Sequence, residues 1–272
     1  MKHEFQSFWY GNNLSPYETL CLKSFIDRGH SFILYAYDEL VVPSGVEVRD
    51  ASKILPSTDV FFYKSGPGAG SVAAFANKFR YALLYQLGGW WVDMDIVCLQ
   101  DEIANHDCFF SFEEACRVNN AMLRFPAKHP VMSTCLEKTI SLGRNVPWGA
   151  AGPKLLTDVL DQLNMLDSAQ SADSCYPIAW REYMHFFDPR MRLSVENRTR
   201  NSIAVHLWNE MIRRLRLNKQ KGPPRESYLD HLCKVHEIEF PDGRLLLQEM
   251  RLRDSFERWK EGKPSWLQSF RI

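Results

Sequence analysis

Apolar and polar positions in the first fifty residues predict strands that alternate with helices. Short apolar runs at 6–10, 31–37 and 46–49 have the length and the aromatic content of buried strands. Between the first two runs, residues 15–18 read Ser-Pro-Tyr-Glu, a capping box with proline at the first helical position, and Gly29 is a suitable helix stop. This strand–helix–strand order predicts βαβ units and a mostly parallel sheet.

The pattern then predicts a long helix over residues 72–87, whose apolar positions recur at helical spacing. Gly88-Gly89 ends this helix, and an aromatic-rich strand that continues to about residue 99 follows it. The glycine-rich segment 64–71 before the helix lacks the Gly-Lys-Ser/Thr of a phosphate-binding P-loop, so it is either a plain connector or a lid. Further along, the pattern predicts a strand at 108–113, helices at 130–142 and from 153 to about 166, and a strand at 202–208.

Two acidic residues interrupt the apolar strand after the glycine pair. Asp93 and Asp95 stand one residue apart, with Trp-Trp-Val before them and Ile-Val-Cys-Leu after them. On a continuous strand the two side chains would share one face. Burial of an unpaired carboxylate is costly, so the pair predicts a cation, and hard oxygen ligands favour Mn²⁺ or Mg²⁺. The alternative is a solvated strand end with two surface acids.

Other candidate side chains lie at the ends of the neighbouring elements. Asn77, Arg80 and Tyr81 are spaced to share one face of the predicted helix, where amide and guanidinium groups suit sugar hydroxyls and phosphate. Trp9 closes the first strand, and its indole suits stacking on a nucleobase as well as simple core packing. His206 ends the late strand, where it is either a metal or phosphate ligand or a packed structural residue.

Composition and charge narrow the classes of partner. Lysine and arginine total 33 and so do aspartate and glutamate, so the net charge is zero and a nucleic-acid partner is not expected. Seven scattered cysteines without a CxxC pair favour reduced thiols and a cytoplasmic protein. The basic stretch 211–225 suits contact with an anionic lipid at the inner membrane face or with an anionic glycan, and it equally suits an ordinary solvated surface.

The run from residue 77 to 99 closely resembles the DXD-motif sugar-transferase family. That family includes the fungal initiating mannosyltransferases, the lactosylceramide α-galactosyltransferases and bacterial polysaccharide glycosyltransferases. Weaker similarities lie at residues 8–11, 15–18, 31–38, 152–153, 175–180 and 204–210. The resemblance implies a Rossmann-like GT-A fold, a nucleotide-sugar donor, a divalent cation and retention of anomeric configuration. No usable similarity is expected after about residue 215.

The resemblance also implies roles for individual residues. Trp9, with Phe8 beside it, matches the aromatic position that stacks on the base, and Arg80 matches a contact to the donor sugar. Asp93 matches the carboxylate near ribose and sugar, Asp95 matches the direct metal ligand, and His206 matches a late metal or phosphate ligand. Many relatives have aspartate where this chain has Asn77, which implies a different preference for the donor sugar. Tyr81 completes the expected donor-binding set.

The sequence therefore predicts a metal-dependent glycosyltransferase that moves a hexose from a nucleotide-diphosphate sugar to a glycan or lipid-linked saccharide. A UDP-sugar is favoured over a GDP-sugar, and the expected catalytic residues are Asp93, Asp95 and Arg80. Two alternatives are a haloacid-dehalogenase-like phosphatase that uses the Asp-x-Asp pair and a non-catalytic sugar-binding module. Residues 1–215 are expected to form the catalytic GT-A domain, and residues 216–272 a helical extension packed on it.

Overall fold

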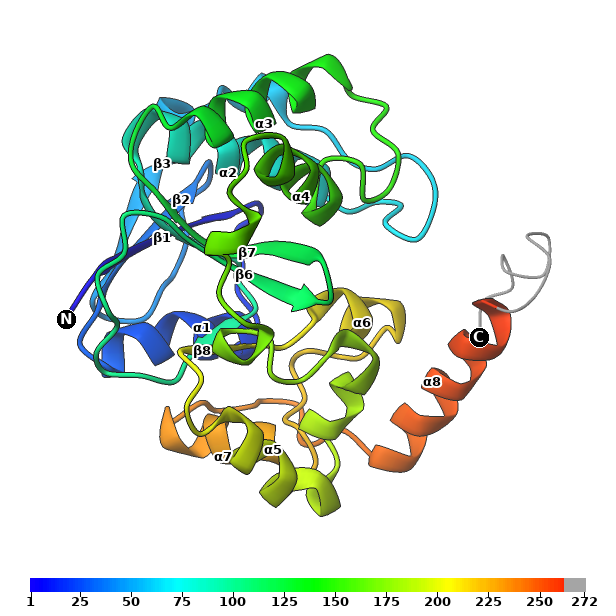
Figure 1. The fold of residues 1–272 in the computed structure, drawn as a ribbon. Helices are drawn as coiled ribbons and strands as arrows, with labels where there is room; N and C mark the ends of the chain where they lie inside the picture. The colour runs from blue at the N-terminus through cyan, green and yellow to red at the C-terminus, as the bar shows by residue number, and fades with distance from the viewer. Residues whose placement is uncertain (262–272) are drawn as a thin grey trace.

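A six-stranded mixed sheet forms the centre of the computed structural model, which describes residues 1–261 (Figure 1). Its strand order is β3-β2-β1-β4-β7-β6; the first four strands are parallel, and β7 and β6 are antiparallel to their neighbours. The strands of this sheet are β1 (Glu4–Trp9), β2 (Ser31–Ala36), β3 (Val46–Asp50), β4 (Gly89–Val92), β6 (Phe109–Glu114) and β7 (Arg117–Phe125). The predicted α/β class with a mostly parallel sheet is confirmed.

A small second sheet and a set of helices complete the described chain. The second sheet pairs β5 (Ile96–Cys98) antiparallel with β8 (Ala204–His206). The α-helices are α1 (Pro16–Asp27), α2 (Ala73–Leu87), α3 (Pro130–Ser141), α4 (Pro153–Gln162), α5 (Arg192–Thr199), α6 (Asn209–Arg214), α7 (Tyr228–Val235) and α8 (Leu247–Glu261). Short 3₁₀ helices lie at Ala51–Lys53, Ser57–Asp59, Leu166–Ser168, Ala172–Ser174, Trp180–Phe186 and Pro189–Met191. No helix within residues 1–261 is both long enough and apolar enough to span a bilayer.

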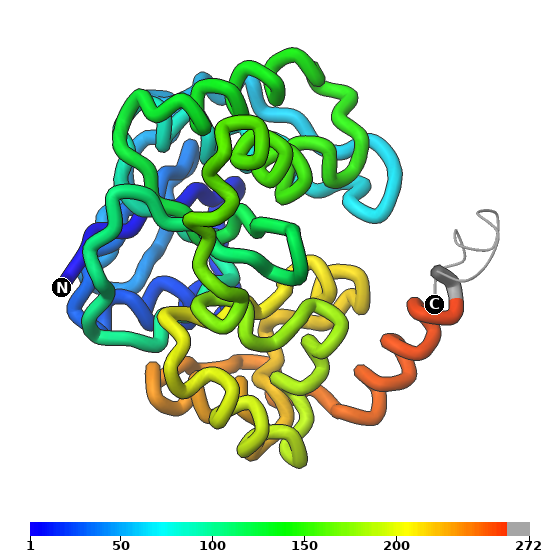
Figure 2. Tube along the Cα trace, in the orientation of Figure 1, coloured from blue at the N-terminus to red at the C-terminus, as the bar shows by residue number. Residues whose placement is uncertain are grey.

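The sheet separates two hydrophobic cores, one on each face. Helices α2, α3 and α4 cover one face, and α1 with the later helices α5 and α7 lies on the other side (Figures 1 and 2). Successive side chains on a strand point to opposite faces, so the neighbouring residues Trp90 and Trp91 enter different cores. Both indoles are almost fully buried. Strand β4, which leads into the acid pair, is therefore packed on both sides.

The strand that was predicted to carry both acids ends before them. β4 ends at Val92, and the chain turns before β5 begins at Ile96 in the other sheet. The amide N–H of Asp93 donates to the Ala121 carbonyl (2.7 Å), and the N–H of Ile96 donates back to the Asp93 carbonyl (3.1 Å). The prediction that one continuous strand places both carboxylates on one face is thus wrong. A turn between two sheets positions them.

Three other predicted elements differ from the structure. β7 was not predicted, the helix from residue 153 ends at Gln162 instead of about residue 166, and the strand predicted over 202–208 is limited to Ala204–His206. These differences are confined to element boundaries except for β7, which contributes directly to the site described below.

The capping box at the start of α1 is confirmed. The Ser15 hydroxyl accepts from the Tyr17 N–H (3.3 Å), and the Glu18 carboxylate accepts from the Ser15 N–H (2.9 Å). Glu18 is almost fully buried and pairs with Lys219. The cap therefore also orients a buried carboxylate that links α1 to the later part of the chain.

We expect Ser15→Ala to lower the free energy of unfolding by about 1 kcal/mol, because an N-cap hydroxyl satisfies one of the open N–H groups of the helix. Urea titration monitored by circular dichroism would measure the change. Ser44→Ala is the matched control, since Ser44 is exposed and makes no side-chain hydrogen bond within residues 1–261. An equal effect of the two substitutions would show that the cap contributes no stability of its own.

The chain after residue 215 packs against the preceding part. Helix α7 contributes Tyr228, Leu229 and Leu232 to the same core as α1. The Tyr17 hydroxyl donates to the Lys221 carbonyl (2.9 Å). Helix α8, at the right of Figure 1, contributes Met250 to the same core, and its Asp254 accepts from the Tyr183 hydroxyl (2.6 Å). The remainder of the predicted extension, residues 262–272, lies outside the described residues.

Candidate functional site

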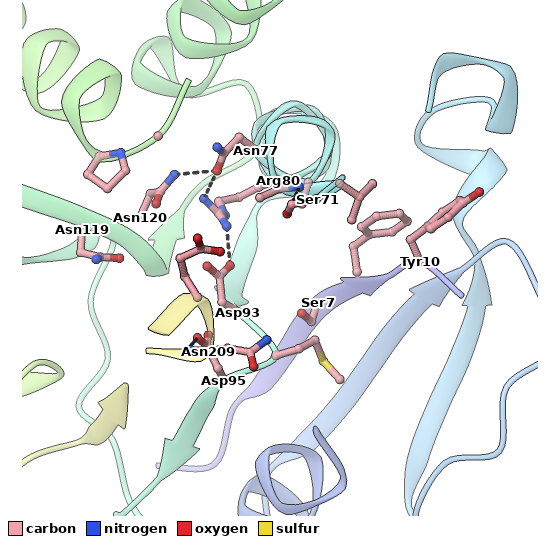
Figure 3. Close-up of a pocket in the computed structure, with 18 of the residues that line it drawn as sticks. Ser7, Tyr10, Ser71, Asn77, Arg80, Asp93, Asp95, Asn119, Asn120 and Asn209 are labelled. Carbon is pink, nitrogen blue, oxygen red and sulfur yellow. Dashed lines mark hydrogen bonds and ion pairs between the residues drawn. The ribbon is translucent and has the colours of Figure 1, made fainter. Parts of the chain in front are cut away.

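A cavity of about 500 Å³ lies at the carboxyl ends of β1 and β4 (Figure 3). Ligands of parallel α/β sheets bind at this edge because the strands end there and loops diverge. The lining includes most of the predicted site residues together with several that the sequence did not indicate. The predicted residues among them are Phe8, Trp9, Asn77, Arg80, Asp93, Asp95 and His206.

Asp93 is held by a buried guanidinium group. Its Oδ1 accepts from Arg80 Nη2 and from Trp91 Nε1 (2.7 Å). The Arg80 side chain is 4% exposed and that of Asp93 is 28% exposed, so the carboxylate faces the cavity and the guanidinium lies behind it. Burial raises the pKa of Asp93, although the charge of Arg80 opposes that effect. The pairing compensates a buried cation and fixes the orientation of the acid.

Asp95 is held by two donors from the opposite side of the site. Its Oδ2 accepts from His206 Nε2 (3.0 Å) and from the backbone N–H of Asn209 (2.8 Å). Burial alone would raise the pKa of Asp95, but the His206 imidazole and the Asn209 N–H hold it below its usual value. Asp95 in turn raises the pKa of His206 against the effect of burial. The geometry thus favours an ionised Asp95.

The backbone conformation of Trp208 explains how the Asn209 N–H reaches the Asp95 carboxylate. Trp208 has left-handed dihedral angles (φ 56°, ψ 53°), a conformation that a bulky side chain adopts rarely. The N–H of the preceding residue, Leu207, donates to the Asp95 carbonyl (2.9 Å), and the N–H of the following residue, Asn209, reaches its carboxylate. The strained turn therefore wraps the chain around Asp95.

The two carboxylates retain unused oxygens. Asp93 Oδ2 and Asp95 Oδ1 accept no hydrogen bond from any residue in the described part of the chain, and both acids line the cavity. Free carboxylate oxygens suit Mn²⁺ or Mg²⁺, which leave coordination positions for phosphate and water. Within residues 1–261, no group of three or more His, Cys, Asp or Glu side chains is arranged to hold a metal ion. The donor set therefore fits a cation that shares its ligands with a substrate.

His206 lines the cavity beside Asp95. Its Nε2 is bonded to Asp95, and its Nδ1 is buried without a hydrogen-bond partner among the described residues. The ring packs against the Trp208 indole at a centroid distance of 4.1 Å. In this arrangement His206 orients Asp95, and its predicted role as a ligand stays a prediction.

Asparagines form the wall beside Arg80. Asn77 Oδ1 accepts from Arg80 Nη1 (2.7 Å) and from Asn120 Nδ2 (3.0 Å), as Figure 3 shows. Asn120 and its neighbour Asn119 line the cavity from β7, so they are site residues that sequence reasoning missed. Tyr81, expected to touch the donor, is fully buried and does not line the cavity. Its hydroxyl accepts from Asn120 Nδ2 (3.3 Å) and donates to the Ala151 carbonyl (3.1 Å), which fixes Asn120.

Aromatic side chains form the part of the cavity at the end of β1. Trp9 is half-buried, and its indole N–H donates to the Asn13 carbonyl (3.0 Å). Phe8 is nearly buried and stacks on Phe79 at a centroid distance of 4.4 Å. Tyr10 follows Trp9 along the cavity and is 41% exposed. This end offers flat apolar surface, in contrast to the charged end at the two acids.

The glycine-rich loop meets two other segments beside the cavity. A Cβ atom on Gly68 would lie 1.9 Å from the Trp148 ring, so only glycine allows this close packing. Tyr63 also packs on Trp148, at a centroid distance of 4.9 Å. Arg213 on α6 donates to the Pro67 carbonyl (2.5 Å). The loop expected to be a connector or a lid thus touches the site from two sides.

Comparisons with known proteins show sequence similarity to glycosyltransferases over part of the chain. The family described as "Alpha 1,4-glycosyltransferase conserved region" matches residues 124–236. Lactosylceramide 4-alpha-galactosyltransferase of Mus musculus is 27% identical over 142 residues, and that of Rattus norvegicus is 26% identical over the same length. Each match covers 48% of this chain and 39% of the relative. The chain is therefore matched to less than half of the length of these relatives.

Two solved structures are similar to this chain at a low level. The PaToxG glycosyltransferase has 14% sequence identity and a TM-score of 0.46, over 62% of this chain and 73% of that chain. A mutant transferase has 12% identity and a TM-score of 0.37, over 62% of this chain and 87% of that chain.

The sequence matches show that part of this chain is similar to glycosyltransferases. Within that class it is similar to the α1,4-glycosyltransferases, and the resemblance expected from the sequence is confirmed. The matched region extends to residue 236, so the expectation that similarity ends near residue 215 is wrong.

Proposed function

We propose that this protein transfers a hexose from a nucleotide-diphosphate sugar, with a UDP-sugar favoured, to a hydroxyl group of a glycan or lipid-linked saccharide. The observation that carries the proposal is the acid pair. Each carboxylate is fixed through one oxygen, its other oxygen accepts no hydrogen bond from the described residues, and both acids line the cavity. An aromatic wall at one end and a wall of amide groups beside the acids suit a base and a sugar, respectively.

Different side chains would contact the base and the sugar of the donor. Trp9 offers its indole to the nucleobase, and Asn77 and Asn120 offer amide groups to sugar hydroxyls. Arg80 orients Asp93 through its ion pair and adds positive charge near the diphosphate. His206 and the Asn209 N–H keep Asp95 ionised and aligned. These fixed groups need little reorganisation during the reaction, and such preorganisation lowers the barrier for a charge-separating step.

Asp95, with Asp93, would hold the divalent cation, Mn²⁺ or Mg²⁺. When bound, the ion would neutralise negative charge that develops on the leaving diphosphate. Retention of configuration is part of the proposal and rests on the family resemblance. The names of the relatives make galactose the first donor sugar to test and a lactosyl group the first acceptor.

A donor screen tests the proposal. The protein is incubated with Mn²⁺ and a panel of UDP- and GDP-sugars, with and without octyl β-lactoside, and nucleoside diphosphate release is measured. We expect release with at least one donor and faster release with an acceptor. Hydrolysis of p-nitrophenyl phosphate without any such release would favour a phosphatase. Sugar binding without turnover, retained in Asp95→Ala, would favour a binding module.

We expect Trp9→Ala to weaken UDP binding by roughly tenfold or more, because stacking of a base on an aromatic ring contributes about 1–3 kcal/mol. Trp9→Phe retains a flat ring and should lose less affinity. Calorimetry with UDP and Mn²⁺ measures both variants, and Trp259→Ala, an exposed indole on α8, serves as the control. Wild-type affinity in Trp9→Ala would place the base elsewhere.

A further inference from the structure

A second cavity, of about 590 Å³, adjoins the donor cavity. The two cavities share five lining residues, which include Asn119, Trp148 and Gly149, so they meet along these residues. Asn119 comes from β7, and Trp148 and Gly149 come from the loop between α3 and α4. A group bound in the second cavity would therefore lie next to a sugar bound in the first.

Three indoles from distant parts of the sequence line the second cavity. They are Trp148, Trp180 and Trp208. Trp148 is 37% exposed and Trp180 is half-buried, so both offer ring surface to a ligand. The Trp208 N–H is already bonded to the Ile178 carbonyl (2.8 Å), which leaves its carbon edges toward the cavity. Large flat apolar surfaces with limited polarity suit the C–H face of a sugar ring.

A fixed carboxylate lies among these rings. Glu113 is the residue before the end of β6 and is nearly buried. Its Oε2 accepts from Asn119 Nδ2 (2.5 Å), and Arg117 binds Oε1. Asn119 is fixed in turn, because its Oδ1 accepts from the Ala121 N–H (2.7 Å). Each carboxylate oxygen has a further lone pair that a hydroxyl group can use. A wholly apolar ligand would cover Glu113 without offering it a donor, which is unfavourable.

We propose that this second cavity binds the acceptor as a saccharide. The apolar face of a sugar ring packs on Trp180 and Trp148, and its hydroxyls bond to Glu113 and Asn119. The inference rests on the proposed transferase function, since it assigns the partner substrate of that reaction. Trp180 and Glu113 line the second cavity and not the first, so substitutions of these two residues test the acceptor site.

The test separates acceptor binding from donor binding. Wild type, Trp180→Ala and Glu113→Gln are compared using the donor that gives nucleoside diphosphate release and a panel of octyl galactosides, glucosides, mannosides and lactosides. The panel also contains octanol and octane-1,2-diol as alcohols without a sugar. We expect both variants to raise the acceptor KM by at least about tenfold, while UDP affinity and acceptor-free donor hydrolysis stay within about twofold of wild type. Trp180→Phe should recover part of the loss, and Trp259→Ala should behave as wild type.

Several outcomes would overturn the inference while leaving the proposed function intact. They are an acceptor KM unchanged within about twofold in both variants, transfer to the plain alcohols as efficient as transfer to saccharides, and donor hydrolysis with no saccharide accepted. A parallel loss of UDP affinity in both variants would also contradict a separate acceptor site. Absence of both nucleotide binding and release in wild type would instead reject the proposed function, and the acceptor assignment with it.

Discussion

Asp95→Asn is expected to abolish measurable sugar transfer and to remove the dependence of UDP binding on Mn²⁺. The substitution preserves shape but removes the negative charge and leaves one acceptor oxygen in place of two. In the native protein, His206 Nε2 and the Asn209 N–H both bond to Asp95. In the variant these two donors would occupy the one remaining acceptor oxygen. Since the carboxylate is proposed as the direct ligand, we expect activity to fall by at least roughly 100-fold.

Two measurements check the Asp95→Asn result. Nucleoside diphosphate release reports activity, and calorimetric titration of UDP with and without Mn²⁺ reports binding in the absence of turnover. Asp161→Asn is the matched control, because Asp161 is an exposed carboxylate on α4 that lines neither cavity. A circular dichroism spectrum identical to that of the native protein confirms folding. Native Mn²⁺-dependent affinity in folded Asp95→Asn would refute the assignment of the cation to this acid.

Arg80→Ala is expected to lower stability as well as turnover. The guanidinium is almost fully buried against Asp93, and its removal leaves a half-buried carboxylate without its ionic partner. Loss of one member of a buried pair costs about 3 kcal/mol. Urea titration would measure the stability change, and donor hydrolysis would measure turnover. Arg49→Ala, which breaks the exposed Arg49–Glu47 pair, should cost less than about 1 kcal/mol.

A double-variant cycle separates the pair from the individual residues. Asn at position 93 can still accept from Trp91 Nε1 but carries no charge to compensate. We therefore expect Arg80→Ala combined with Asp93→Asn to be more stable than the sum of the two single changes predicts. Strict additivity of the two unfolding free energies would show that the ion pair contributes nothing beyond its separate residues.

Local sequence signals predicted most of the parallel half of the fold. The capping box, the helix stop at Gly88 and the apolar runs act within a few residues, so they define α1, α2 and the buried strands. β7 carries no such signal. Its centre contains Asn119 and Asn120, a residue type that is depleted in strands, and its hairpin loop contains Cys116 at φ 60° where Asn-Gly would be expected. Only tertiary hydrogen bonds make these asparagines acceptable in a buried strand.

The candidate site was predictable as a set of residue types but not as a set of pairs. The acids and Arg80 could be selected from the sequence because charge inside an apolar run is unusual. That Arg80 bonds to Asp93 while His206 bonds to Asp95 depends on a turn between two sheets, and no short-range pattern encodes that turn. Asn120 was missed for the same reason, since its function depends on its neighbours across the fold.

The contacts made after residue 215 bear on how acceptor preference could change in evolution. Lys219 pairs with buried Glu18 on α1. Burial raises the pKa of Asp95, whereas His206, the Asn209 N–H and the Lys219 ammonium group lower it. His236 bonds to Asp27 at the other end of α1 (2.8 Å). Exchange of this C-terminal segment would therefore alter the ionisation of Asp95 as well as the contacts on α1. Point changes in the second cavity leave both contacts intact, so we expect them to disturb the two acids less than exchange of the whole segment would.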